Sequence, residues 1–497
     1  MVGRRGFLAG LGGLAMVPLA GCGSGRSEPE PSLSPVSATD RYRPQFHYTP
    51  VSGNLADPNG LVYTDGTYHL FHQSDGRWAH ATAPDLVHWT RRGIALDHDR
   101  LGQVLSGSAV VDGSRLVAAY TCTAGGEAQC LAIGSRAGTD WRRHEHNPVI
   151  GNDGRQDFRD PKIIWHTATD RWVMLVAAGD VVDLFTSTDL LTWRAASQFG
   201  VGFGLHSAVW ECPGLVELPV RDSPETRWVL YVSVGDSEQT NGSMMQYFVG
   251  DFDGSTFTPE ESADTIHLVD HGQDFYAAQT WFGLADQRAV WLAWMGNWRY
   301  PYQLPTGDWR GTMSIPRQLS LQRRPDGSLI LLQQPVMELR SLRDRTTEVS
   351  PGPVKGEVPV ATSGTSLDIE LDLQPGAGRS GLRLLKSGDF YTEIGIDCDN
   401  ATLYVDRSRS GTTTITDRSE TPYVLPRRST MLNEPNARAS LRILVDRTTV
   451  EVFDDRGPVF SCVVLPPPDA AGIALFATGA GTYVHALGIH EMSSIWT

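Results

Sequence analysis

The chain has 497 residues, which is more than one ordinary hydrophobic core holds, so we expect two domains. Its 51 glycines, 30 prolines and 14 tryptophans are typical of many short strands joined by turns. The formal net charge of -15 at pH 7 argues against nucleic acid or an anionic surface as a partner. It is compatible with a neutral or a cationic substrate.

Residues 1–21 have the features of an export signal. A twin-arginine start, Arg4-Arg5, precedes an apolar run that is too short to span a membrane comfortably. The run ends in Leu19-Ala20-Gly21-Cys22, which resembles a bacterial lipobox, so we expect Cys22 to be lipidated and to anchor an exported protein at the cell surface. The alternative is an ordinary signal peptide and a secreted protein. Residues 22–40, rich in Ser, Pro and Gly, predict a disordered tether.

Six cysteines are present, and the five other than Cys22 are an odd number, which leaves at least one free thiol in an exported protein. Cys122 and Cys130 flank the turn Ala124-Gly125-Gly126-Glu127 and could pair across a hairpin. Sequence alone leaves this pairing open, because a disulfide depends on geometry.

Residues 41–345 repeat one pattern of an apolar strand, a turn and a second apolar strand. The expected innermost strands begin 50, 53, 51 and 65 residues apart, at Asp57, Gly107, Asp160, Glu211 and Tyr276. Repeats of this length predict a five-bladed β-propeller with four strands per blade. No comparable segment has the period of a long amphipathic helix. Segments that pair an aspartate with a later tryptophan are expected in outer strands: Asp85–Trp89, Thr139–Trp141 and Asp189–Trp193.

Residues 351–497 show a different pattern, which predicts a C-terminal β-sandwich and an all-β chain. Ser366–Leu373 alternates apolar and polar residues with a period of two, as a half-buried strand does. Residues 441–453 have a hairpin pattern, and 471–478 are typical of a buried strand. We found no catalytic acidic constellation here, so a structural or glycan-contacting role is expected.

Three acidic residues stand at the starts of expected inner strands and should converge at one end of the propeller axis. They are Asp57 in Asp57-Pro58-Asn59-Gly60, Asp160 in Arg159-Asp160-Pro161 and Glu211 in Glu211-Cys212-Pro213. Converging carboxylates repel, so their pKa values separate and leave one group protonated and another ionised. Cleavage of a glycosidic bond needs such a pair. We also expect Arg159 to keep Asp160 ionised through its opposite charge.

One such acid alone is more often a turn or strand-end carboxylate that caps backbone N–H groups. Three at matching positions favour an active site. Together with further motifs in the same order, they resemble glycoside hydrolase family 32, the family of invertases, inulinases and levanases. The resemblance spans nearly the whole mature chain, and its further motifs are His47–Pro50, Leu70–Gln73, Trp78–Ala81, Ser106–Val110, Asp274–Ala277 and Trp309–Arg317.

The resemblance implies a role for each acid. Asp57 would attack the anomeric carbon of a fructosyl unit, and Glu211 would protonate the leaving oxygen and then activate water. Asp160 would bind fructose hydroxyls and stabilise the oxocarbenium-like transition state. The resemblance also implies that Cys212 is a small buried neighbour, not a nucleophile. Substrate binding would involve Asn59, Gln73, Trp78, Ser106, Arg159, Tyr276 and Trp298.

The resemblance therefore implies a retaining β-fructofuranosidase that acts on levan, inulin or sucrose. Asn54, Ala56 and Leu105 stand where hydrolases of the family usually carry Trp, Asn and an aromatic residue. These departures keep a fructosyltransferase on the same fold as an alternative. A catalytically weak fructan-binding lipoprotein is a third possibility, and the motifs argue against a five-bladed arabinan hydrolase. Linkage preference and exo or endo action stay open.

No metal or other cofactor is expected. His267 and His271 have the spacing of a zinc-binding helix, but Leu268 stands where that motif needs glutamate, and the stretch does not have a helical pattern. No glycine-rich nucleotide loop follows a strand.

Overall fold

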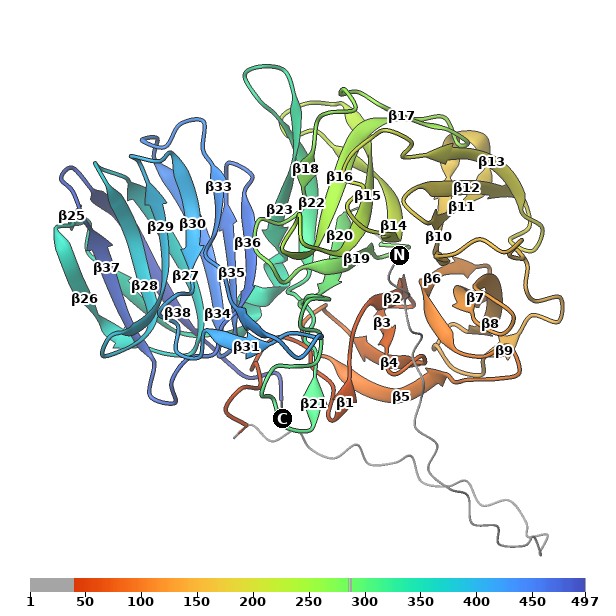
Figure 1. The fold of residues 1–497 in the computed structure, drawn as a ribbon, viewed down its shortest axis with the longest axis horizontal. Helices are drawn as coiled ribbons and strands as arrows, with labels where there is room; N and C mark the ends of the chain where they lie inside the picture. The colour runs from red at the N-terminus through yellow and green to blue at the C-terminus, as the bar shows by residue number, and fades with distance from the viewer. Residues whose placement is uncertain (1–39, 285, 287, 497) are drawn as a thin grey trace, which may run out of the picture. The chain divides into compact units, whose positions relative to one another are not determined.

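The computed structural model describes residues 40–284, 286 and 288–496 (Figure 1). The expected signal sequence, Cys22 and residues 22–39 of the expected tether lie outside this part of the chain. The described part is built from strands, with two short 3-10 helices, η1 (Thr167–Thr169) and η2 (Met337–Leu342). None of its helices is long and apolar enough to cross a membrane.

Five antiparallel sheets of four main strands each follow one another along the chain (Figure 1). Their innermost strands, β2, β6, β10, β14 and β19, contact one another in sequence, and β19 contacts β2, which closes the ring. The predicted five-bladed β-propeller is therefore confirmed.

The bounds of the strands in the five blades are as follows. The first blade has β2 (Pro58–Thr64), β3 (Thr67–Gln73), β4 (Trp78–Ala83) and β5 (Thr90–Leu96). The second has β6 (Val104–Asp112), β7 (Arg115–Cys122), β8 (Ala128–Ser135) and β9 (Arg142–Arg143). The third has β10 (Phe158–His166), β11 (Arg171–Ala178), β12 (Val182–Ser187) and β13 (Arg194–Phe199).

The fourth blade has β14 (Trp210–Pro219), β15 (Thr226–Ser237), β16 (Gly242–Phe252) and β17 (Phe257–Pro259), and β18 (His267–Leu268) also pairs with β16. The fifth has β19 (Tyr276–Thr280), β20 (Ala289–Trp294), β22 (Arg317–Arg323) and β23 (Leu329–Pro335). A separate parallel pair joins β1 (Gly53–Asn54) to β21 (Trp309–Arg310).

A β-bulge lies near the start of every innermost strand. The register against the second strand shifts between Asn59 and Val62, Val104 and Gly107, Arg159 and Lys162, Glu211 and Gly214, and Tyr276 and Gln279. A bulge bends the strand and redirects a side chain. At three of the bulges a non-glycine residue takes a positive φ, namely Asp160 (65°), Cys212 (47°) and Ala277 (57°). Such backbone is uncommon outside glycine and concentrates at functional sites.

The segments expected in outer strands form the turns that precede those strands. In the first of them Asp85 Oδ1 accepts hydrogen bonds from the backbone N–H of Val87 (3.1 Å) and His88 (2.9 Å), and β5 begins only after Trp89. In the third, Asp189 caps the turn before β13 in the same way. The prediction was wrong because the aspartate side chain satisfies the backbone donors that a strand would present to its neighbour.

Two further sheets, packed face to face, form the predicted β-sandwich. The first sheet has the order β24 (Arg343–Val349), β38 (Tyr483–Met492), β27 (Ser366–Gln374), β34 (Ala439–Asp446), β35 (Thr449–Asp454) and β36 (Val459–Val463), with β25 (Gly352–Pro353) on β38. The second has the order β26 (Gly356–Ser363), β37 (Gly472–Ala477), β28 (Arg379–Ser387), β29 (Phe390–Asp397), β30 (Thr402–Asp406) and β33 (Arg428–Met431). A small hairpin joins β31 (Thr414–Thr416) and β32 (Pro422–Val424).

The alternating stretch Ser366–Leu373 lies within β27, as predicted. Its apolar residues Leu367, Ile369, Leu371 and Leu373 are buried in one cluster with apolar residues of the second sheet. The period-two pattern of β27 therefore supplies part of the first sheet's side of the sandwich core.

Charged side chains are buried where the last blade meets the sandwich. Arg317 on β22 is fully buried and donates to Asp270 Oδ2 (3.1 Å) and Glu451 Oε1 (2.5 Å). His47 lies beside the same network, with Nε2 3.1 Å from Glu451 Oε2 and Nδ1 2.9 Å from Asp446 Oδ2. Buried charges are tolerated because each has a partner of opposite sign.

Candidate active site

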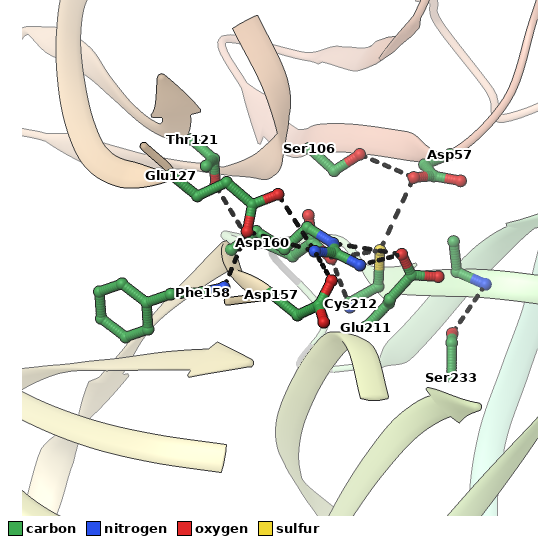
Figure 2. Close-up of polar contacts among 12 residues, drawn as sticks. Asp57, Ser106, Thr121, Glu127, Asp157, Phe158, Asp160, Glu211, Cys212 and Ser233 are labelled. Atoms are coloured by element: carbon green, nitrogen blue, oxygen red, sulfur yellow. Dashed lines mark hydrogen bonds and ion pairs between the residues drawn. The ribbon is translucent and has the colours of Figure 1, made fainter. Parts of the chain in front are cut away.

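A pocket of about 190 Å³ opens at the ends where the innermost strands begin. It brings together Asp57, Asp160 and Glu211, which are far apart in sequence. Its other lining residues are Asn54, Ala56, Gln73, Asp75, Gly76, Leu105, Ser106, Arg159, Trp298 and Tyr302. Figure 2 shows the three acids facing the same space, with Asp160 in β10, Glu211 in β14 and Asp57 directly before β2.

Asp57 directly precedes β2 and is held at one of its two oxygens. Ser106 Oγ donates to Asp57 Oδ2 over 2.7 Å, and Cys212 Sγ lies 3.8 Å from the same oxygen. Oδ1 is buried and has no hydrogen-bond partner within the described ranges. Burial raises the pKa of Asp57 to about 6, although the Ser106 hydrogen bond opposes this, and the charge of Glu211 raises it further.

Asp160 is the most buried of the three acids, 5% exposed. Its Oδ2 accepts a hydrogen bond from the backbone N–H of Cys212 (2.9 Å), and its own N–H donates to Thr121 Oγ1 (2.9 Å). Burial raises the pKa of Asp160 to about 7, against the lowering effect of Arg159. Arg159 thus favours the ionised form of Asp160, as predicted, but burial outweighs its effect, because Arg159 Nε is 4.0 Å from Asp160 Oδ2 and its fork faces Glu211.

Glu211 has a partner at each carboxylate oxygen. Arg159 donates to Oε1 from Nη2 (2.8 Å) and Nε (3.2 Å), and Tyr276 Oη donates to Oε2 (2.5 Å). The remaining Arg159 nitrogen, Nη1, contacts Asp157 Oδ1 (2.7 Å) and Glu127 Oε1 (3.1 Å). Burial alone would lower the pKa of Arg159, but the surrounding carboxylates raise it, so its charge is permanent.

Cys212 fills the space between two acids. Its Sγ lies 3.6 Å from Asp160 Oδ2 and 3.8 Å from Asp57 Oδ2. Burial, followed by the charges of Asp160, Asp57 and Glu211, raises the pKa of this thiol well above its ordinary value. A thiol held neutral in this way is a poor nucleophile.

The other residues expected at the site take two kinds of position. Gln73, Ser106, Arg159 and Trp298 line the pocket, and Trp298 packs edge-on against Tyr276 with ring centroids 6.4 Å apart. Tyr276 is buried but reaches Glu211 through its hydroxyl.

Asn59 and Trp78 lie behind the pocket and are both fully buried. Asn59 Oδ1 accepts from Gly107 N–H (3.2 Å), and Trp78 Nε1 donates to the Leu105 carbonyl (2.9 Å). Their contacts fix the backbone of the second blade next to the pocket.

Four residues that the sequence did not single out also contribute to the site. Asp75 and Tyr302 line the pocket, and Asn54 Nδ2 donates to Asp75 Oδ1 (2.7 Å). Glu127 and Asp157 contact Arg159. All four lie in loops or turns, where strand periodicity gives no signal; only the position of Asp157 two residues before Arg159 could have drawn attention.

The histidines at zinc-motif spacing lie in two separate environments. His267 pairs with Glu261 and stacks on Tyr247, with ring centroids 5.0 Å apart. His271 packs against Phe460 at 5.8 Å. The disulfide left open from sequence is present between Cys122 and Cys130.

Two family models match the chain. "Glycosyl hydrolases family 32 N-terminal domain" matches residues 47–335, and "Glycosyl hydrolases family 32 C terminal" matches residues 337–491. The chain is 39% identical to the levanase of Bacillus subtilis (strain 168), over 92% of this chain and 71% of that protein. It is 40% identical to the levanase of Bacillus sp. (strain L7), and this match covers 92% of this chain but only 53%, about half, of that protein.

Solved structures agree with these matches. The exo-inulinase of Aspergillus awamori superimposes with a TM-score of 0.83 at 31% identity, covering 92% of this chain and 99% of that one. The β-fructofuranosidase of Schwanniomyces occidentalis, complexed with fructosyl-erythritol, gives 0.82 at 26% identity, with the same coverage of 92% and 99%. The family models together cover most of the chain, and the chain belongs to glycosyl hydrolase family 32.

Proposed function

We propose that this chain is a retaining β-fructofuranosidase that hydrolyses levan or inulin, or sucrose. The observation that carries the proposal is the convergence of Asp57, Asp160 and Glu211 on one pocket, with both oxygens of Glu211 hydrogen-bonded and one oxygen of Asp57 without a partner in the described part of the chain. The relatives named levanase and exo-inulinase support the choice of fructans as substrates.

In the first step, the carboxylate of Asp57, which lines the pocket, attacks the anomeric carbon of the bound fructosyl unit. The glycosidic C–O bond breaks, its electron pair stays on the leaving oxygen, and Glu211 delivers a proton to that oxygen. Ser106 donates a hydrogen bond to Asp57 Oδ2 over 2.7 Å and so fixes the orientation of the carboxylate. The product is a fructosyl ester on Asp57 and a free alcohol, as a double displacement requires.

In the second step, ionised Glu211 removes a proton from water as the water oxygen attacks the same carbon. The ester bond to Asp57 breaks, which releases fructose with its original anomeric configuration and restores both carboxyl groups. Arg159 and Tyr276 keep Glu211 in one orientation through both steps. Asp160, whose carboxyl group lines the pocket, binds fructose hydroxyls and stabilises the positive charge that develops on the ring.

We assign the catalytic domain to residues 41–345 and the accessory β-sandwich to residues 351–497. We further propose that residues 1–21 are an export signal, that Cys22 is lipidated, and that 22–40 is the tether. The lipobox-like sequence supports lipidation at Cys22, and a 31% identical relative named extracellular exo-inulinase from Aspergillus niger supports export.

Growth with a clickable fatty acid should label the parent protein but not Cys22→Ala, and the variant should move from the cell pellet to the medium. Equal labelling of both would refute lipidation at Cys22.

The proposed activity is tested by the product profile on levan, inulin and sucrose. The parent protein should release free fructose from at least one of them, while folded Asp57→Ala and Glu211→Ala variants release essentially none. Fructosylated products in place of free fructose would point to transfer and to the altered acceptor side at Asn54 and Ala56. Full activity in both variants would refute the assignment.

A further inference from the structure

The β7–β8 hairpin of the second blade makes several hydrogen bonds to the segment that carries Arg159 and Asp160. Strands β7 and β8 are joined by residues 123–127, and the disulfide between Cys122 and Cys130 closes this turn. Glu127, the last residue of the turn, accepts a hydrogen bond at Oε2 from the backbone N–H of Phe158 (2.8 Å). Both of its oxygens also face Arg159 Nη1, at 3.1 and 3.2 Å.

The same hairpin holds this segment at two further points, of which Figure 2 shows the one at Thr121. Thr121 Oγ1 accepts from Asp160 N–H (2.9 Å), and Gln129 Nε2 donates to the Phe158 carbonyl (2.9 Å). Thr121 and Gln129 are themselves joined, Oγ1 to Oε1, over 2.9 Å. Three consecutive residues, 158–160, are thus fixed from one side by one cross-linked hairpin.

The guanidinium of Arg159 transmits this hold to Glu211. Glu127 and Asp157 bind its Nη1 edge, while Nε and Nη2 donate to Glu211 Oε1. Because a guanidinium is planar and rigid, fixing one edge fixes the direction of the other. The Glu127 side chain is 25% exposed and that of Asp157 is 38% exposed, so Glu127 is the better shielded of the two anchors.

We infer that Glu127 is a positioning residue for the acid–base group Glu211, acting through Arg159; this rests on the function proposed above. Glu127 does not line the pocket and has no direct contact with the three acids among the described residues. Its effect is geometric, since it aims Arg159, and electrostatic, since its charge offsets that of Arg159 beside Glu211.

Removing the charge of Glu127 should move the pH–kcat/KM profile in one direction only. The charged and titratable groups that face Glu211 and Arg159 are Asp57, Glu127, Asp157, Asp160, Cys212 and Tyr276. Removing the charge of Glu127 leaves Arg159 less neutralised and so makes the electrostatic potential beside Glu211 more positive. The basic limb of the pH–kcat/KM profile, where the general acid loses its proton, should therefore move to lower pH by about half a unit.

The test compares Glu127→Gln and Glu127→Ala with the parent on levan and on a nitrophenyl β-fructofuranoside. Glu127→Gln should shift the basic limb, and Glu127→Ala should lower kcat/KM on levan by about 10- to 100-fold with a smaller change in KM. The nitrophenyl leaving group needs little protonation, so its kcat/KM should fall by less than about 3-fold. Glu260→Gln, which removes a carboxylate that pairs with Arg227 in the fourth blade, is the matched control and should leave all three readouts unchanged.

A structural role alone would give a different result. If Glu127 only braces the turn, both variants should lower the melting temperature while the pH profile and the ratio between the two substrates stay as in the parent, and that outcome would overturn the inference. Failure of the proposed function is separately visible, because Glu211→Ala would then keep its activity on levan. Glu127→Asp, which keeps the charge on a shorter side chain, should restore the basic limb but only part of the rate.

Discussion

The carboxyl group of Asp57 should be required for activity and yet reduce the stability of the folded protein. Burial raises the pKa of Asp57 from 3.8 to about 6, so the ionised form is disfavoured in the folded state. One pKa unit corresponds to about 1.36 kcal/mol, which gives at most about 3 kcal/mol of destabilisation at neutral pH. Asp57 lines the pocket and is only partly buried, and solvent screening reduces this to roughly 1–2 kcal/mol.

Asp57→Asn keeps the shape of the side chain and can still accept the hydrogen bond from Ser106. We therefore expect it to abolish activity and to raise the melting temperature by about 2 °C at about pH 8. The folded-state pKa is raised above the unfolded one, so the destabilisation is full above about pH 6 and disappears as the pH falls toward 3.8. The gain in melting temperature should accordingly shrink at about pH 4.5.

Differential scanning calorimetry of parent and variant at both pH values measures this gain. The same change at exposed Asp222 is the control and should leave the pH dependence of unfolding as it is in the parent. A variant that is less stable than the parent at about pH 8, or a gain that does not change with pH, would show that the buried charge of Asp57 does not destabilise the folded protein.

Three more predictions follow from single contacts. Ser106→Ala removes the hydrogen bond that lowers the pKa of Asp57, so the acid limb of kcat/KM should move above about pH 6; an unmoved limb would contradict this. Arg317→Met leaves the carboxylate of Glu451 buried without its main partner and should destabilise the protein by about 3–5 kcal/mol in thermal unfolding, and a loss below about 1 kcal/mol would argue against it. Burial alone would lower the pKa of His47, but two carboxylates raise it from 6.5 to about 9. The stabilisation from protonated His47 is thus full below pH 6.5 and is lost as the pH rises through about 9. The melting temperature of the parent should fall over this pH range, and the fall should be smaller in His47→Gln. The same pH dependence in both proteins would contradict this.

Repetition in the sequence was enough to predict the propeller and the meeting of its three acids. Asp57, Asp160 and Glu211 stand at matching points of repeated strands, and closure of the ring brings matching points together. The β-sandwich followed from period-two alternation, which the structure places in β27. In these cases a local pattern and the overall topology depend on the same residues.

Other features depend on contacts between segments that no local pattern encodes. Arg159 follows Asp157 and precedes Asp160, yet its fork turns toward Glu211, because that carboxylate and Glu127 offer closer partners than Asp160 does. Trp78 was expected to contact substrate, as an aromatic side chain in a sugar site does, but its indole is fully buried and donates a hydrogen bond to the Leu105 carbonyl.

The proposed double displacement needs Asp57 as the nucleophile and Glu211 as the acid–base group. Glu211→Ala should still accept a fructosyl unit from a nitrophenyl β-fructofuranoside, whose leaving group needs no proton, and should release it slowly because water is no longer activated. Peptide mass spectrometry of this variant, quenched during turnover, measures where the fructosyl unit resides. We expect a fructosyl ester on the peptide that contains Asp57. An ester on a peptide with Asp160 but not Asp57, or an active variant with no covalent adduct, would contradict it.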